Sequence, residues 1–147
     1  MNKHILGLIK YLILFVIGGS IYYAIETVYK GLTSGSHSHW SMFIVGGICF
    51  VLIGLINNVI SWTMPLWRQM LIGAIIVTVV EFISGYVINI QLQWNVWDYS
   101  NLPFNVIGQV CLPFVIVWFV ISGIAVIFDD YLRYWIFHEK KPSYKLF

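Results

Sequence analysis

Charged residues are scarce in this sequence. Asp, Glu, Lys and Arg make up 10% of its 147 residues, whereas soluble domains carry about a quarter. The few basic residues form no patch suited to nucleic acid, so no nucleic-acid partner is expected. A soluble core of this length could not bury a chain that is 60% hydrophobic, and the composition therefore excludes an ordinary soluble domain.

Cysteine and recognisable catalytic motifs are also scarce. Cys49 and Cys111 both lie in apolar runs, where a thiol behaves as a small hydrophobic group, and their spacing suits neither a metal nor a disulfide framework. His37 and His39 share a Gly/Ser stretch without further ligands, so we expect no metal and no cofactor. No Walker A, Gly-x-Ser-x-Gly or His-Glu-x-x-His motif occurs, and an enzyme is not expected.

Long apolar runs are what the sequence has in abundance. Mean hydropathy is +0.85, and a run of about 18 apolar residues can cross the hydrocarbon layer as a helix. The runs predict four spans at about residues 11–29, 41–62, 70–90 and 106–128. The first run is too long for a signal peptide and is interpreted as a retained span. We therefore predict an all-α membrane protein, a bundle of about four transmembrane helices forming one integral-membrane domain over residues 1–147.

The basic residues predict the orientation of these spans. With the N-terminus in the cytoplasm, one basic residue, Lys30, lies outside. Seven lie inside: Lys3, Lys10, Arg68, Arg133, Lys140, Lys141 and Lys145. Because Lys and Arg are retained on the cytoplasmic side of short loops, both termini are expected there, in a bacterial inner membrane. The connection between the third and fourth spans then lies outside.

Two glutamates fall within the predicted spans. Glu81 lies near the middle of the third span and Glu26 about one turn from the outer end of the first. An ionisable group in hydrocarbon costs about 2.5–3.5 kcal/mol on insertion scales, so each is a functional candidate. Because burial disfavours the charged form of a carboxyl group, either could take up a proton or hold a cationic ligand.

Structural interpretations stand beside these functional ones. Lys30 follows Glu26 at the spacing of a helical ion pair, and Tyr22 and Tyr23 lie one turn back. Glu81 has few polar neighbours on its own helix, so its partner is expected from another helix. Several polar and small residues fit helix packing before function. They are Asn57, Asn58, Gly18, Gly19, Gly46, Gly47, Gly54, Gly73, Gly85 and Gly123.

A polar and aromatic segment separates the third and fourth spans. Residues 94–105 read WNVWDYSNLPFN, too short and too polar to cross a membrane. Trp97, Asp98, Tyr99 and Asn105 are its strongest candidates for contact with a ligand. Non-helical backbone at membrane depth persists when buried in protein or lining a wet cavity. We therefore predict an ordered cap or re-entrant piece that closes a mouth over Glu26 and Glu81.

Asp129 and Asp130 follow the fourth apolar run. Their place before Arg133 and the basic C-terminal residues indicates the water boundary of the last span. We expect them to pair with basic neighbours.

Three stretches of the sequence resemble one protein family. They are GSIYYAIETVY at Gly19 to Tyr29, EFISGYVIN at Glu81 to Asn89, and WDYSNLPFNVIGQVCLPF at Trp97 to Phe114. The chain resembles the bacterial family labelled putative ABC-transporter permease, or ABC transporter type IV, whose members are small integral-membrane proteins. The resemblance implies a role in transport and assembly with copies of itself or another membrane subunit, with a separate ATPase as a candidate partner.

Three hypotheses of function remain open at this stage. The first is a transport-related subunit, an ABC-type permease or a small ion- or proton-linked component, in which Glu26 and Glu81 bind a proton or cation. The second is a structural or regulatory membrane subunit whose polar residues stabilise a bundle. The third is a membrane-embedded enzyme that modifies a lipid, with Asp98 and a glutamate as an acid/base pair.

Overall fold

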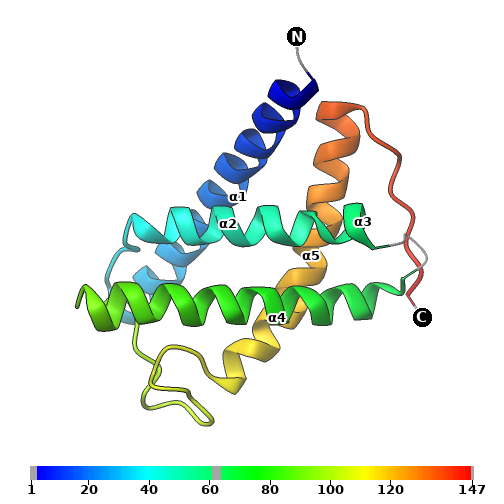
Figure 1. Ribbon diagram of the computed structural model, residues 1–147. Helices are drawn as coiled ribbons and strands as arrows, with labels where there is room; N and C mark the ends of the chain where they lie inside the picture. Colours follow the sequence, from blue (N-terminus) through cyan, green and yellow to red (C-terminus); the bar gives the residue numbers. More distant parts are fainter. Residues whose placement is uncertain (1–2, 61–63, 147) are drawn as a thin grey trace. The chain divides into compact units, whose positions relative to one another are not determined.

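The computed structural model describes residues 3–60 and 64–146, which fold into helices and connecting segments (Figure 1). The helices are α1 (Lys3–Ser34), α2 (Ser41–Gly54), α3 (Ile56–Val59), α4 (Leu66–Gly85), the π-helix η1 (Tyr86–Gln91) and α5 (Leu112–Phe137). Four stretches are long and apolar enough to cross a membrane: His4–Ser34, Ser41–Val59, Leu66–Gln91 and Leu112–Phe137. The predictions of an all-α membrane protein and of four spans are confirmed.

The chain divides into two compact units. The first comprises Met1–Leu52, with α1 and most of α2, and the second comprises Ile53–Phe147, with α3, α4, η1 and α5. That residues 1–147 act as one integral-membrane domain stays a prediction.

Helix α1 is longer than its predicted span of residues 11–29. Its 32 residues extend about 48 Å at 1.5 Å per residue, more than the roughly 30 Å hydrocarbon layer. The helix stops before Gly35, which has a φ of 67°. Glycine adopts this left-handed conformation without the steric cost that a side chain imposes, and it ends helices for that reason.

The second and third spans also differ from their predicted limits. Helix α2 ends at Gly54, and α3 continues the span to Val59; the predicted end at residue 62 lies outside the described residues. Helix α4 starts at Leu66, directly after Pro65. Proline has no backbone N–H, and the first N–H groups of a helix have no acceptor within the helix, so proline is favoured where a helix begins. Its last turns widen into η1, which carries the span to Gln91.

The predicted start of the fourth span at residue 106 is wrong. Helix α5 begins at Leu112, and the residues before it form a turn in which Val106 N donates to Val110 O at 2.9 Å. Ile107 and Gly108 have φ values of 47° and 72°, which no helix contains. Apolar composition could not distinguish this turn from helix, whereas Pro113 marks the true first turn.

Close approach of α1 and α2 holds the first unit together. An added Cβ at Gly18 or Gly19 would meet Phe50 or Phe43 of α2, and one at Gly46 would meet Tyr22 of α1. The aromatic residues of each helix thus occupy the space that the glycines of the other leave. This is the packing that small residues permit between membrane helices, and it agrees with the predicted role of these glycines.

The second unit is built on the pair α4 and α5. Gly73 of α4 faces Ser122 of α5, and Gly123 of α5 faces Met70 of α4. Figure 1 shows the two helices crossing, with the 92–111 segment joining the end of η1 to the start of α5. The 92–111 segment and the crossing of α4 and α5 together determine where the candidate site of the second unit lies.

Candidate functional site

Glu81 is a buried carboxylate with hydrogen bonds to both oxygens. It lies on α4 with 5% of its surface exposed. Its Oε1 accepts a hydrogen bond from the Tyr99 hydroxyl at 2.9 Å, and its Oε2 accepts one from the indole N–H of Trp118 at 2.9 Å. Trp118 is the expected partner from another helix, α5. Tyr99 comes from the predicted polar-aromatic segment, so that segment reaches a carboxylate inside the span.

Tyr99 is fixed in place by further contacts. Its ring stacks on Phe114 with centroids 4.5 Å apart and an interplanar angle of 17°. Its backbone N–H donates to Gly108 O at 2.8 Å. A tyrosine held by its ring, its backbone and its hydroxyl has little freedom to leave Glu81, so the hydrogen bond joins two ordered parts of the chain.

Two buried amides, Asn89 and Gln109, hold the rest of the 92–111 segment. Asn89 Nδ2 donates to Gln109 Oε1 at 2.8 Å, and Asn89 Oδ1 accepts from Val96 N at 2.7 Å. The Trp97 indole N–H donates to Gln109 O at 3.0 Å. Neither amide was predicted from the sequence as a site residue, although an amide beside an apolar run is a signal that could have indicated both.

Asp98 and Asn105 shape the turn of the segment. Asp98 Oδ1 accepts hydrogen bonds from Ser100 N at 2.8 Å and Ser100 Oγ at 2.5 Å, which lower the pKa of this exposed carboxyl group because they favour its charged form. Asn105 Nδ2 donates to Ser100 O at 3.1 Å and to Leu102 O at 2.9 Å. Gly108 N donates to Asn105 Oδ1 at 3.1 Å. The structure thus brings Tyr99 to Glu81, whereas Asp98 and Asn105 bond within the segment itself.

The backbone of the segment is strained at several places. Gln93, Asn95, Phe104 and Ile107 have positive φ values between 47° and 56°, a region that is costly for a β-branched residue such as Ile107. Such conformations persist where surrounding contacts over-determine them. The hydrogen bonds of Tyr99, Asn89 and Asn105 supply those contacts, so the segment is ordered, and that it caps a mouth stays a prediction.

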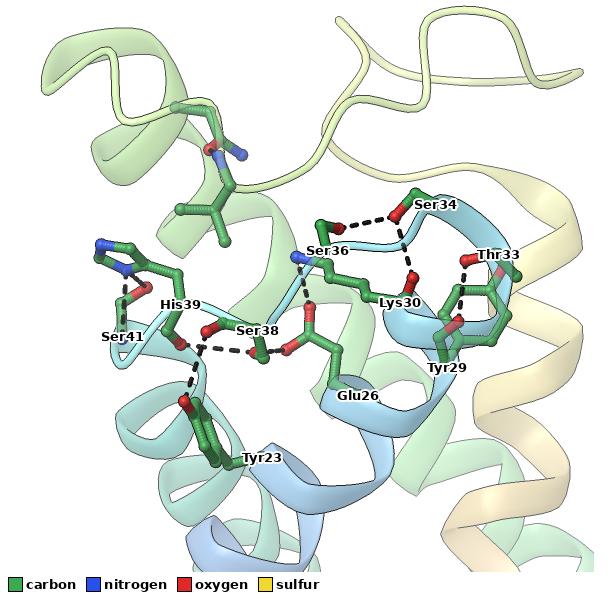
Figure 2. Close-up of polar contacts among 12 residues, drawn as sticks. Tyr23, Glu26, Tyr29, Lys30, Thr33, Ser34, Ser36, Ser38, His39 and Ser41 are labelled. Carbon is green, nitrogen blue, oxygen red and sulfur yellow. Dashed lines mark hydrogen bonds and ion pairs between the residues drawn. The ribbon is translucent and has the colours of Figure 1, made fainter.

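Glu26 lies in the first unit with partners of its own (Figure 2). Its Oε1 is 3.0 Å from Lys30 Nζ, the predicted helical ion pair, and its Oε2 accepts a 2.5 Å hydrogen bond from Ser38 Oγ. Tyr23 OH donates to Ser38 O at 3.4 Å rather than to the carboxylate. Glu26 thus ties the end of α1 to the 35–40 connection. The predicted mouth over both glutamates involves both units and stays a prediction.

Asp129 and Asp130 lie within α5 rather than after its end, and that they mark the water boundary stays a prediction. Helix α5 continues to Phe137, and the two aspartates are 0% and 4% exposed. Asp129 Oδ2 pairs with Arg133 Nε at 2.5 Å, as expected of a basic neighbour. Asp130 Oδ2 accepts from Asn57 Nδ2 at 2.5 Å and Tyr144 OH at 2.7 Å. These partners allow the two acidic side chains to be buried within the protein.

The C-terminal residues return to the body of the second unit at this cluster. Lys145 O accepts from Leu66 N at the start of α4 at 2.7 Å, and Tyr144 reaches Asp130. Burial and the hydrogen bond to Asp130 raise the pKa of Tyr144. Beside this contact is a hollow of about 310 Å³ lined by Asn58, Asp130, Arg133, Glu139 and Lys140. None of these residues was predicted from the sequence to line a binding site.

The comparison with known families agrees with the stretches that carry the resemblance. The family model described as "Putative ABC-transporter type IV" matches residues 13–144. The chain belongs to this family. Its match covers most of the first span, the other three spans, the 92–111 segment and the buried cluster around Asp130. Neither the curated proteins nor the solved structures include a match to this chain.

Proposed function

We propose that this chain is a transport-related multi-pass subunit of the bacterial inner membrane, an ABC-type permease or a small proton- or ion-linked component. The observation that supports it is the hydrogen bond between Glu81, buried in a membrane-spanning helix, and Tyr99 of the ordered 92–111 segment. An intramembrane carboxylate marks a functional site by default. Here it also holds the segment that caps one end of the α4 and α5 pair.

The proposed mechanism is release of the cap through Glu81. The ionised carboxylate accepts hydrogen bonds from Tyr99 and Trp118, and such charge-assisted bonds are about twice as strong as neutral ones. A proton taken up by Glu81, or a cation bound to it, weakens the bond from Tyr99. The 92–111 segment then loosens, and Trp97 and Asp98 move with it. Binding at one carboxylate is thereby converted into motion of the cap.

Glu26 serves as a second ligand or proton site in this proposal. Its ion pair with Lys30 provides an internal cation that an external one would have to displace. Since Ser38 donates to the same carboxylate, displacement would also loosen the 35–40 connection. The two glutamates thus act by the same chemistry within their separate units.

Orientation and partners follow from the charge distribution and the family. We place both termini in the cytoplasm and the 92–111 segment outside, because seven of the eight basic residues then lie inside.

Beyond the lipid bilayer, we propose assembly with further copies or with another membrane subunit. A separate ATPase is the candidate source of energy, as the family description implies.

A structural or regulatory subunit is the second candidate. It is favoured by one observation: both oxygens of each glutamate already have a partner within the protein. In this case the carboxylates stabilise the packing of the helices and connecting segments and bind no ligand. We propose no enzymatic role, since the hydrogen bonds that Asp98 accepts come from Ser100, whereas an acid/base pair would require Asp98 to share a substrate with a glutamate.

Thermal stability in detergent, across pH and a panel of metal and amphipathic cations, separates the candidates. A ligand that binds the folded state stabilises it by about 2.7 kcal/mol at a hundredfold excess over its dissociation constant. A cation- or pH-specific shift that is lost in Glu81→Gln but kept in Tyr86→Phe supports transport. No shift with any cation or pH, together with a lower melting temperature of Glu81→Gln, overturns it in favour of the structural candidate.

A further inference from the structure

The hollow of about 310 Å³ in the second unit has a mixed-charge lining. Asp130 and Arg133 come from α5, Glu139 and Lys140 from the residues that follow it, and Asn58 from α3. The volume falls within the roughly 300–1,000 Å³ of small-ligand sites. The four charged groups of the lining comprise two acids and two bases, so the lining itself is formally neutral, and Arg133 is held in it through its Nε by Asp129, which does not line the hollow. A neutral lining with separate acids and bases matches a zwitterion better than an anion or a cation.

The deepest acidic group has an oxygen available to a ligand. Among the described residues, Asn57 and Tyr144 both donate to Oδ2 of Asp130. A carboxylate offers about four acceptor positions on its two oxygens, so Oδ1 can accept from a bound group. Asp130 is 4% exposed, and Asn57 and Tyr144 fix its orientation. The carboxylate is therefore pre-positioned as an acceptor for an N–H donor.

The hollow lies where a lipid headgroup would be found. The membrane-spanning stretch Leu112–Phe137 supplies Asp130 and Arg133, one to two turns before its end. Glu139 and Lys140 follow one residue after the end of the span and precede two further lysines, Lys141 and Lys145. Charged residues at the end of a span lie at the level of the headgroups. A ligand here would meet the apolar surface of α5 on one side and water on the other.

We propose that this hollow binds a phosphoethanolamine group, carried by an aminophospholipid of the surrounding bilayer. Arg133 and Lys140 would bind the phosphate, because guanidinium and ammonium groups are the usual phosphate ligands. Asp130 and Glu139 would accept hydrogen bonds from the primary ammonium. A quaternary choline ammonium has no N–H to donate, and a glycerol headgroup has no positive charge. The site is thus selective for a primary amine.

Binding of three lipids with identical short acyl chains tests this proposal. Phosphatidylethanolamine, phosphatidylcholine and phosphatidylglycerol are added to delipidated full-length protein in detergent, and bound lipid is measured by native mass spectrometry. Phosphatidylethanolamine is expected to bind about tenfold more tightly than the other two, since one charge-assisted hydrogen bond contributes about that factor. Equal binding of the three lipids would overturn the proposal.

Substitutions at hollow-lining residues outside the helices test the site with little effect on folding. Glu139→Gln and Lys140→Ala should each lower affinity for phosphatidylethanolamine about tenfold, whereas Lys141→Ala, a neighbour that does not line the hollow, should leave it unchanged. A preference that survives the first two variants, or that all three reduce equally, contradicts a site at the hollow. Soluble phosphoethanolamine is the last arm. If soluble phosphoethanolamine binds more weakly than phosphatidylethanolamine, the result supports a lipid of the bilayer as the ligand. If it binds more tightly, the result overturns the lipid proposal in favour of a free metabolite.

Discussion

The Tyr99 hydroxyl donates a hydrogen bond to Glu81 Oε1 at 2.9 Å across 18 positions of the chain. This bond joins a buried carboxylate of α4 to a segment without helical structure. Trp118 donates to the other carboxylate oxygen, so Glu81 joins α4, α5 and the 92–111 segment at one point. The stability of the segment and the state of Glu81 should therefore depend on each other.

Removal of either partner of this bond should destabilise the protein. Tyr99→Phe deletes the hydroxyl and leaves the buried Oε1 without that donor, which costs about 1–3 kcal/mol. Glu81→Gln keeps the shape but loses the charge. A double-mutant cycle from denaturant or thermal unfolding in detergent should give a coupling energy of about 0.5–3 kcal/mol. Tyr86→Phe, an exposed tyrosine of η1, is the control, and strictly additive effects would contradict the contact.

The Asp98 carboxyl group should titrate below its usual range. Hydrogen bonds from Ser100 favour its charged form and lower its pKa from the ordinary value of 3.8. A lowered pKa means that the contribution to stability is present above pH 3.8 and is lost as pH falls through the lowered value. Carboxyl-carbon NMR titration should show the pKa of Asp98 rising toward 3.8 in Ser100→Ala. An unchanged pKa in that variant, with Ser143→Ala as control, would refute the cause.

Tyr144 should anchor the C-terminal residues to the second unit. Its pKa is raised from 10.0 by burial and by the hydrogen bond to Asp130, so the anchoring is present below pH 10 and is lost as pH rises through the raised value. Tyr144→Phe should lower the free energy of unfolding by about 1–2 kcal/mol. In the wild type, proteolysis near residue 140 should become faster as pH rises above 10, and this dependence on pH should be absent in Tyr144→Phe. Tyr134→Phe is the control, and an equal loss of stability in that variant would contradict the anchoring role of Tyr144.

Gly54 should tolerate no larger residue. A Cβ added at this position would meet the Asp129 carboxyl group, which is 0% exposed and paired with Arg133. Gly54→Ala should therefore cost about 1–3 kcal/mol through overpacking. Gly31→Ala is the matched control, because Gly31 is also helical and an added Cβ there meets no atom within 4 Å. Equal melting temperatures of the two variants would show that Asp129 does not lie against Gly54.

The sequence predicted the parts of the fold that depend on local composition. Four apolar runs became four spans, because hydropathy alone determines which segments can cross a bilayer. The ion pair of Glu26 and Lys30 was predictable from its four-residue spacing. The start of α5 was not, because Val106 and Ile107 are as apolar as any helical residue and the turn depends on positive φ values.

The candidate site depended more on contacts distant in sequence. Tyr99 was a candidate because of its aromatic neighbours, but its bond to Glu81 requires the 92–111 segment to fold back on α4. The burial of Asp130 was not predicted, because its partners, Asn57 and Tyr144, are 73 and 14 residues away. Whether a charged residue near a span end is buried depends on such partners, which a linear pattern does not contain.

Hydrogen–deuterium exchange of the 92–111 segment, measured against pH and cation concentration, tests the central claim most directly. The account predicts that amides of the segment, including that of Tyr99, exchange slowly in the wild type and faster when Glu81 binds a proton or cation. Glu81→Gln should exchange fast under all conditions, whereas Tyr86→Phe should follow the wild type. Exchange that does not respond to pH or cations, and is equal in the wild type and Glu81→Gln, would contradict coupling between the buried carboxylate and the segment.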